Sequence, residues 1–512
     1  MKKILPSVFY NSISLFGGTV SAVSFGLIIF LIVLEAFSSQ SKPYIGILTF
    51  VILPIFLIFG LILFFIGAIR ERKQRFRGEI TKYKLPSVDL NDPHDRRAVV
   101  FFSTVGLLLL IFSTFGSFKA YEYTDSDSFC GQMCHKVMDP EYIAYKASPH
   151  SRVGCVKCHI GPGADWFVRS KLSGIYQVYA TLFNKFPRPI PTPIENLRPA
   201  QETCEQCHWP NHFFAEKLVI NDYYESDEKN TRWNVYLLMK IGGGNEESGP
   251  TTGIHWHMNI NNKVTYYALD RERQIIPYIE VERKDASKSI YKSTEIEISE
   301  NDLLTANKRR MDCIDCHNRP THIYHPPARS INHLISLGWI NRKLPYIKSL
   351  AVDVLERNYE NKQNAIDSIK FLIEEFYNAN YPEIVKSMNN DIQRAIEEIQ
   401  KIYSRNYFPE MRVSWKNHLD NIGHLYYLGC FRCHDGKHVN EKGKVLSKEC
   451  NTCHTILSQT FENEPIRLSF EGLEYKHPVD IGNDWREINC SECHGESSLP
   501  KSYKTNYLKS KK

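Results

Sequence analysis

Long apolar runs alternate with short polar loops in the first quarter of the chain. The runs cover residues 19–37, 44–69 and 98–118. Each is long enough to cross the hydrocarbon core of a bilayer, because a helix of roughly 20 apolar residues spans about 30 Å. The pattern predicts that residues 1–120 form a membrane anchor with three transmembrane helices.

Basic residues are concentrated in one loop of this anchor. Residues 70–97, between the second and third runs, hold nine Lys or Arg, whereas residues 38–43 hold only Lys42. Loops that are rich in Lys and Arg stay in the cytoplasm. We therefore expect a cytoplasmic N-terminus, a location in a bacterial inner membrane, and a periplasmic region after the third helix.

The pattern changes twice beyond the anchor. Residues 216–312 contain alternating apolar and polar segments, such as KVTYYAL at 263–269, which are typical of strands. Residues 346–405 have apolar positions at helical spacing. These two sections are expected to be β-rich and helical, respectively.

Cysteine spacing decides the class of protein. The chain has 14 cysteines in seven close pairs, and a histidine follows each pair directly. Six pairs are Cys-x-x-Cys-His, the attachment signature of c-type haem, in which two thioethers hold the porphyrin and the adjacent histidine is the proximal ligand of the iron. The seven motifs are Cys130/Cys134 with His135, Cys155/Cys158 with His159, Cys204/Cys207 with His208, Cys313/Cys316 with His317, Cys430/Cys433 with His434, Cys450/Cys453 with His454 and Cys490/Cys493 with His494.

Other interpretations of the cysteine pairs fit less well. A disulfide framework does not explain a histidine after every pair. Zinc sites combine two cysteine pairs, or a pair with spaced histidines, and need no histidine directly after the second cysteine. The first pair, Cys130/Cys134, has three intervening residues, so one must bulge out, and the alternative there is a non-haem thiol pair. We expect seven covalently bound haem c groups.

These patterns predict a membrane-anchored multihaem cytochrome c. Three N-terminal transmembrane helices precede a mostly helical or irregular, haem-packed periplasmic region with a small β-rich section. The net charge is +6, but no Lys/Arg block with interleaved aromatic residues indicates nucleic-acid binding. The expected segments are 1–120 (anchor), 121–215 (haems 1–3), 216–312 (β-rich, without haem), 313–345 (fourth haem), 346–405 (helical, without haem) and 406–512 (last three haems and a basic tail).

A six-coordinate haem needs a second axial ligand, and histidine is abundant outside the motifs. This abundance favours coordination by two histidines at most of the irons. We expect one of His255 and His257, in GIHWH, to be a ligand, and we favour His257. The other expected distal ligands are His150, His322, His424, His438 and His477, whereas His212, His325, His333 and His418 are expected to be spare.

A methionine stands three residues after the first motif. Met138 either ligates the first haem or packs on its porphyrin. A thioether ligand would raise the potential of that haem relative to a pair of histidines.

The stretch CGQMCHKVMDPEYIAYKASPHSRVGCVKCHIGPG at 130–163 resembles the NapC/NirT family of membrane-anchored quinol-dehydrogenase cytochromes. The shared features are a membrane helix, a Cys-His motif with a nearby Met, then Tyr-Lys-x-Ser-x-His, then Cys-x-x-Cys-His. Further on, ETCEQCHWP, GIHWH, MDCIDCHNRPTH, GCFRCHDGKH and HPVDIG are similar to the larger seven-haem inner-membrane cytochromes of the ImcH type. Together the resemblance covers most of the chain.

The resemblance implies that menaquinol is the electron donor and is oxidised at the outer membrane face beside the first haem. Relatives place a lysine after the second haem motif, and an acidic residue, near the quinone. Lys171 in WFVRSKLSG is the candidate lysine. No acidic residue stands at the family's spacing, which leaves Asp139 and Asp165 as alternatives. The three-residue gap at Cys130/Cys134 departs from the smaller members, so the ligation of the first haem is left open.

We therefore expect a quinol dehydrogenase that passes electrons through a haem chain to periplasmic c-type cytochromes or a reductase, in anaerobic or extracellular respiration. Two alternatives stay open. One is a terminal multihaem reductase of nitrogen or sulfur oxyanions, and the other is the electron-transfer subunit of such a complex. A reductase needs an open position at an iron, and the surplus of histidine argues against one.

Overall fold

A computed structural model gives the fold of two compact units. One unit comprises Met1–Phe129 and Cys155–Tyr179, and the other comprises Cys130–Gly154 and Ala180–Lys512. The structure describes residues 9, 11–36, 52–77, 90–93, 96–97, 100–101, 104, 119, 122–133, 135–161, 164–194, 197–209, 213, 215–242, 253–258, 262–462 and 464–495.

Two long apolar helices dominate the first unit. These are α1 (Ser12–Ala36) and α3 (Leu53–Phe76), and both are long and apolar enough to cross a membrane. Small residues let their backbones approach closely, since a Cβ on Gly17 would lie 2.5 Å from the Gly60 carbonyl oxygen. The third predicted helix, 98–118, lies outside the described residues apart from residues 100, 101 and 104.

The first unit also contains the second cysteine motif. Helix α6 (Cys155–His159) carries this motif, and the long helix α7 (Ala164–Leu182) follows it and ends just inside the second unit. The backbone amide of Cys155 donates to Asp127 Oδ1 at 3.0 Å, which fixes the start of the motif.

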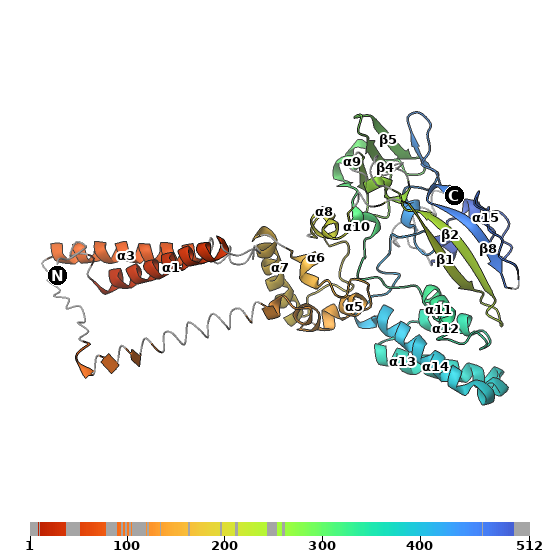
Figure 1. Cartoon of the computed structure of the whole chain (residues 1–512), viewed down its shortest axis with the longest axis horizontal. Coiled ribbons are helices and arrows are strands. Elements are labelled where there is room, and N and C mark those ends of the chain that lie inside the picture. The colour runs from red at the N-terminus through yellow and green to blue at the C-terminus, as the bar shows by residue number, and fades with distance from the viewer. Residues whose placement is uncertain are drawn as a thin grey trace. The chain divides into compact units, whose positions relative to one another are not determined.

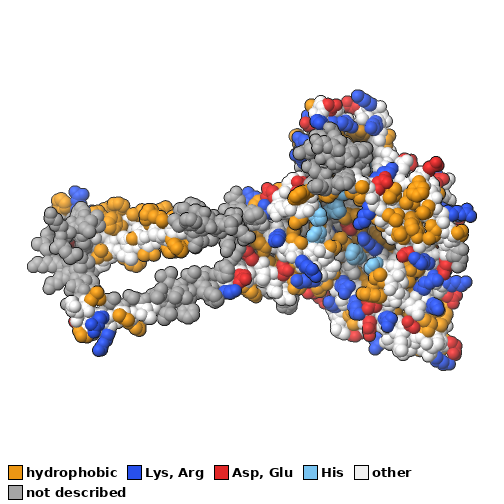
Figure 2. Space-filling model, in the orientation of Figure 1, with side chains coloured by type: hydrophobic (Ala, Val, Ile, Leu, Met, Phe, Trp, Pro, Cys, Tyr) orange, Lys and Arg blue, Asp and Glu red, His pale blue; other side chains and the backbone are white. Residues whose placement is uncertain are grey.

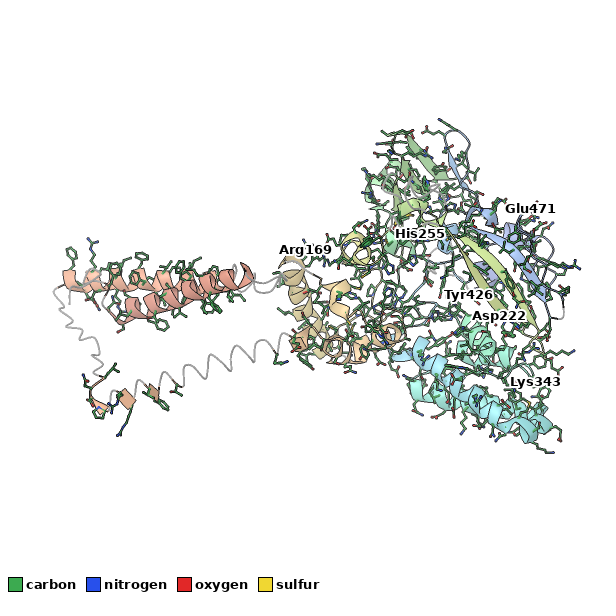
Figure 3. All side chains as sticks on the ribbon, in the orientation of Figure 1. Arg169, Asp222, His255, Lys343, Tyr426 and Glu471 are labelled. Atoms are coloured by element: carbon green, nitrogen blue, oxygen red, sulfur yellow. The ribbon has the colours of Figure 1, made fainter. Side chains whose placement is uncertain are left out.

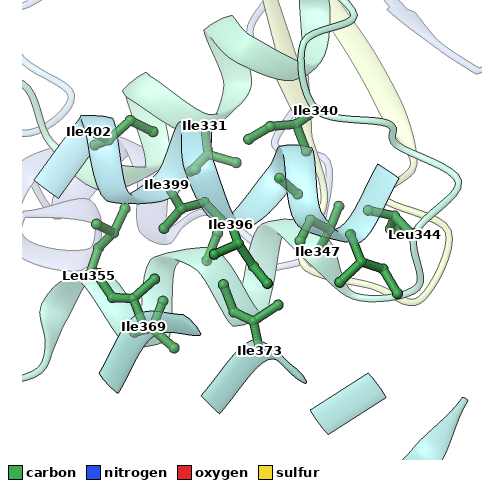
Figure 4. Packing of buried hydrophobic residues seen from close by; sticks show 14 of the residues in the cluster. Ile331, Ile340, Leu344, Ile347, Leu355, Ile369, Ile373, Ile396, Ile399 and Ile402 are labelled. Carbon is green, nitrogen blue, oxygen red and sulfur yellow. The ribbon is translucent and has the colours of Figure 1, made fainter. Parts of the chain in front are cut away.

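A bundle of helices builds the largest apolar core of the second unit (Figure 1). Its members are α11 (Pro327–Ser336), α12 (Ile347–Glu356), α13 (Lys362–Asn380) and α14 (Pro382–Asn406). Ile331, Ile347, Ile369 and Ile399 are fully buried in it, as Figure 4 shows. The Asn361 side chain accepts from the Asn364 amide at 2.9 Å and so starts α13. The predicted helical section is thus helical and has a core of its own.

Two antiparallel sheets, as far as the described residues go, complete the second unit. One has the strand order β1-β2-β8 and the other β6-β3-β4-β5-β7. Six strands come from the predicted β-rich section, but β7 and β8 come from the C-terminal segment. The strands are β1 (Glu216–Tyr224), β2 (Arg232–Lys240), β3 (Lys263–Ala268), β4 (Tyr278–Glu282), β5 (Lys288–Ser293), β6 (Asn307–Arg310), β7 (His438–Asn440) and β8 (His454–Phe461).

Short helical turns carry the cysteine motifs. A single turn places residues i and i+3 on one side, so both thiols of a Cys-x-x-Cys pair share a face. The turns that carry the third to seventh motifs are η4 (Cys204–Gln206), α10 (Cys313–Cys316), η8 (Gly429–Arg432), η9 (Cys450–Thr452) and α16 (Cys490–His494). The first motif falls on η3 (Phe129–Met133) and the start of α5 (His135–Lys146), and the remaining short helices are α8 (Ala200–Thr203), η6 (Ile254–Met258), α9 (Glu300–Thr305), η7 (Pro409–Met411) and α15 (Asp484–Glu487).

Candidate functional site

The cysteines of the third to seventh motifs are free thiols. The histidine amide of a motif donates to the carbonyl oxygen of its first cysteine, at 2.8 Å for His317 and Cys313. Burial raises the pKa of the Cys313 and Cys433 thiols to about 12, so neither is a thiolate near neutral pH. Two thiols on one face of a turn suit two thioether bonds to a single porphyrin.

Exposure differs among the second cysteines of three other motifs. Cys158 is partly buried, whereas Cys207 and Cys493 are exposed. Each stands three residues after another cysteine and directly before a histidine. Haem attachment at Cys158, Cys207 and Cys493 is supported by this motif alone and stays a prediction.

Five motif histidines each face a second histidine that is distant in sequence. The ring centres of the five pairs lie between 5.9 and 6.4 Å apart. The pairs are His150 with His208 at 6.0 Å, His255 with His317 at 6.4 Å, His257 with His434 at 5.9 Å, His424 with His454 at 6.2 Å and His477 with His494 at 6.1 Å.

This separation is the one that an iron between two imidazoles requires. A metal–imidazole nitrogen bond is about 2 Å and a ring nitrogen lies roughly 1.1 Å from the ring centre, so two rings bound to one iron have centres about 6 Å apart. Stacked or hydrogen-bonded imidazoles would come closer. The residues present therefore fit a haem iron with two histidine ligands at five of the seven motifs.

Backbone carbonyls orient several of these rings. The Nδ1 atom of His257 lies 2.8 Å from the Ile254 oxygen, and that of His477 lies 2.8 Å from the Val479 oxygen. A carbonyl at Nδ1 fixes the tautomer and leaves Nε2 for a metal. His255, labelled in Figure 3, is held in the same way by the Ile241 oxygen at 3.2 Å, just beyond the end of β2.

Burial lowers the pKa of several of these imidazoles and so favours the neutral form, which is the form that binds a metal. It lowers the pKa of His424 to about 4, with His454 adding to the effect. Burial also lowers the pKa of His317 and of His434. Figure 2 shows histidine side chains, in pale blue, gathered on one face of the second unit.

The predicted distal ligands differ in whether they face a motif histidine. His150, His257, His424 and His477 each face a motif histidine, and so does His255, which the sequence analysis set aside in favour of His257. The sequence did contain a signal for both, because GIHWH places two histidines on one short turn.

His322 faces none of these five motif histidines. Its Nδ1 atom lies 2.9 Å from the Glu141 carbonyl oxygen and 3.3 Å from Glu141 Oε2. Arg319 also pairs with this carboxylate, at 3.2 Å. Burial raises the pKa of Glu141, but Arg319 and the nearby histidines outweigh it and the pKa is lowered. The position of Nδ1 resembles that in the paired rings, so His322 remains a candidate ligand.

His438 contradicts its expected role. Its Nδ1 atom lies 2.8 Å from Asp435 Oδ1, and its Nε2 atom lies 2.7 Å from the Ile276 carbonyl oxygen. Both nitrogens therefore donate to oxygens, and neither is left for an iron. Burial lowers the pKa of His438, but the Asp435 carboxylate outweighs burial and the pKa is raised. We correct the assignment, because His438 is a structural residue that ties β7 to the segment just before β4, a strand of the same sheet.

Parts of the predicted entry site lie outside the described residues. These are Cys134, together with the side chains of His135, Asp165 and Lys171. Met138 and Asp139 are partly buried on α5.

Helix α7, which carries Lys171, exposes an apolar stripe. Leu172 is 64% exposed and Ile175 is 68% exposed, and Val168, Tyr179 and Leu182 continue the stripe at helical spacing. By contrast, Ala180 on the other side of the helix is buried. The same helix carries Arg169, which is exposed, and Lys171.

Residues in or near consecutive motifs contact one another from the third motif to the seventh. Of the four contacts given below, that of Arg432 with Asp315 joins two motifs directly, and the others involve flanking residues or paired histidines. The contacts are Phe213 with the His255 ring at 4.6 Å, Arg432 Nη2 with the Asp315 oxygen at 2.8 Å, Phe431 stacked on His424 at 4.3 Å, and Lys448 Nζ with the Arg486 oxygen at 3.3 Å. These contacts connect the sites of the third to seventh motifs in chain order.

Comparisons with known proteins agree with this organisation. Residues 92–190 match the model of the NapC/NirT cytochrome c family, N-terminal region, and residues 424–506 match a cytochrome c3 model. The chain is 46% identical over 487 residues to the cytochrome c-type protein ImcH of Geobacter sulfurreducens, covering 95% of each protein. No solved structure matches. An identity of this size over nearly the whole length shows that the chain belongs to the NapC/NirT family of multihaem c-type cytochromes, as a membrane-anchored electron-transfer protein similar to ImcH.

Proposed function

We propose that the chain carries seven haem c groups, oxidises menaquinol at the outer face of the inner membrane, and passes the electrons to periplasmic c-type cytochromes or a reductase. The observation that carries the proposal is the set of five histidine pairs at iron-spanning separation. They lie in a chain whose N-terminal region matches the NapC/NirT family.

The chain's own residues have distinct roles in this proposal. The seven cysteine pairs would form the thioethers, the motif histidines would be proximal ligands, and the paired histidines would be distal ligands. Haem c supplies reversible one-electron chemistry when bound. With a histidine on each side of the iron, the five paired sites would have no open iron position. This favours electron transfer over the reduction of an oxyanion, for which only the first two motifs would remain.

In this proposal, quinol is oxidised beside α7 and the first two motifs. A quinol stays in the membrane, so its site must border lipid. The exposed apolar stripe of α7, a helix that also carries Arg169 and Lys171, has the character of a helix that lies in a membrane surface. In this proposal Lys171 binds a quinol oxygen, and Asp139 or Asp165 accepts a proton. Met138 is kept as a candidate ligand of the first haem.

Rapid mixing with a reduced menaquinone analogue tests the function. The detergent-purified holoprotein is mixed with the quinol, and haem absorbance is followed. Reduction that a quinone-site inhibitor blocks is the expected result. No reduction by quinol, while dithionite reduces every haem, would mean that electrons enter from a protein partner and would refute the proposal.

A substitution of Lys171 tests the entry site. Lys171→Ala should slow reduction by quinol and leave reduction by dithionite unchanged. Lys185→Ala is the matched control, because Lys185 is an exposed lysine just beyond the end of α7. Equal quinol rates in the two variants would remove Lys171 from the site.

A further inference from the structure

One turn of six residues carries two of the paired histidines. Gly253 and η6 (Ile254–Met258) form this turn, with His255 and His257 two residues apart. Gly253 has φ +88°, and a Cβ there would lie 2.5 Å from the Lys240 carbonyl oxygen. The His255 amide then donates to the Ile241 oxygen at 3.0 Å. Only glycine permits both the backbone conformation and this close approach.

The two imidazoles of the turn face different cysteine motifs. His255 lies beside His317 of the fourth motif, with ring planes 3° apart, whereas His257 lies beside His434 of the fifth motif, with planes 86° apart. Two residues of chain span at most about 7 Å, so both rings depend on one short piece of backbone. Each Nδ1 atom is near a carbonyl oxygen, of Ile241 and Ile254 respectively, which leaves both Nε2 atoms directed away from the turn.

A second connection joins the same two motifs. Arg432, inside the fifth motif, is buried, and its Nη2 atom donates to the Asp315 carbonyl oxygen inside the fourth motif at 2.8 Å. Its Nε atom donates to the Gly429 oxygen at 2.9 Å, which ties the guanidinium to its own turn. Asn421 Nδ2 donates to the same Asp315 oxygen at 3.0 Å. Hydrogen bonds therefore also connect the two sites on their proximal sides, where the cysteine motifs lie.

We propose that Gly253–Met258 is a double ligand clamp, in which His255 binds the iron of the fourth haem and His257 binds the iron of the fifth. Gly253 is a positioning residue for both ligands. The clamp rests on haem attachment at the fourth and fifth motifs, as proposed above, but not on quinol oxidation. Its consequence is that one backbone change alters the coordination of two haems at once, whereas loss of one histidine alters a single haem.

Spin-state counting in the oxidised holoprotein tests the clamp. Covalent haem is measured by the pyridine haemochrome assay, and high-spin iron by low-temperature EPR and near-infrared magnetic circular dichroism. His255→Ala and His257→Ala should each convert one haem equivalent from low spin to high spin. Gly253→Ala should alter the iron coordination, and so the spin state, of two haem equivalents. Gly443→Ala is the matched control, because Gly443 also has a positive φ, +75°, but has open space at its Cβ, and it should perturb none.

A variant of the fourth motif assigns the ligands. When Cys313 and Cys316 are both replaced by Ser, His255→Ala should produce no high-spin haem, whereas His257→Ala should still produce one equivalent. A wild-type haem count with every iron low-spin in His255→Ala or His257→Ala would overturn the clamp, and so would a Gly253→Ala spectrum that matches Gly443→Ala. If Gly253→Ala does not accumulate, the two histidine variants decide alone. A haem count other than seven in the wild type would instead count against the proposed function.

Discussion

Replacing Asp315 should destabilise the fourth haem site more than any exposed charge does. The Asp315 side chain is 1% exposed and lies between the two cysteines of its motif. Its Oδ1 atom accepts from Tyr266 Oη at 2.7 Å and Arg309 Nε at 2.6 Å, and Arg273 Nη1 lies 3.1 Å away. Its Oδ2 atom accepts from the Asp312 amide at 2.7 Å.

The magnitude follows from what each substitution leaves behind. Asp315→Ala leaves two partly buried guanidinium groups and a buried phenol without their common acceptor. Breaking a buried ion pair on one side costs about 3–5 kcal/mol, so we expect that loss for Asp315→Ala. Asp315→Asn keeps the shape and one acceptor oxygen but loses the charge. Hydrogen bonds to charged groups contribute about 1.5–3 kcal/mol, and we expect a loss in that range for Asp315→Asn.

Urea unfolding of the holoprotein, followed by far-ultraviolet circular dichroism, measures both losses. The midpoint should fall while the slope stays unchanged, because the surface exposed on unfolding is the same. Asp353→Asn is the control, since Asp353 is 57% exposed and pairs with Arg357 on a helix surface. Such a pair contributes about 0–1 kcal/mol. An Asp315→Asn midpoint equal to that of Asp353→Asn would refute the account of the buried cluster.

Other parts of the chain give three further predictions. The Asp435 carboxylate raises the pKa of His438, so this ion pair stabilises fully below the ordinary histidine pKa of about 6.5 and is lost as pH rises through the folded-state pKa. The free energy of unfolding of the wild type should therefore fall as pH rises through that pKa. This pH dependence should be absent in His438→Gln, and a pH profile equal to that of the wild type would contradict the ion pair. Ile369→Ala, at a fully buried position of the helical core, should cost about 2–5 kcal/mol and speed hydrogen exchange in α13, whereas exposed Phe371→Ala should not. Cys134→Ser should lower the count of covalent haem by one, and an unchanged count would show that the first motif is not an attachment site.

The sequence predicts haem attachment motif by motif, because thioether attachment is local. Two thiols and a histidine must lie on one turn, so the whole requirement is written in five consecutive residues. Distal ligands carry no such local rule. His322 and His438 follow their motifs at similar spacing, yet the first has its Nδ1 atom against a carbonyl, as the paired rings do, and the second donates from both nitrogens. His438 differs because Asp435 is close to it in sequence and the Ile276 carbonyl, from the segment before β4, is close to it in space. The second of these contacts depends on the fold.

The expectation that one of His255 and His257 is a ligand treated the segment as extended. An extended segment would place both rings on one face, toward one neighbour. The close approach of Gly253 to β2 instead turns the segment into a short helix, from which the rings reach separate motifs. The β-rich section was recognised from its alternating pattern. Its partners β7 and β8 were not, because strand pairing across the chain depends on tertiary contacts that periodicity does not encode.

Strand β8 has a consequence for biogenesis. Trp233 of β2 pairs with Phe461 of β8, so this sheet cannot close until nearly the whole polypeptide has been made. Five complete cysteine motifs and most of a sixth precede β8, whose first residue, His454, ends the sixth motif. Until then one edge of β2 offers unpaired backbone groups to any passing strand. The sheet of β1, β2 and β8 is therefore completed only after most of the cysteine motifs have been made.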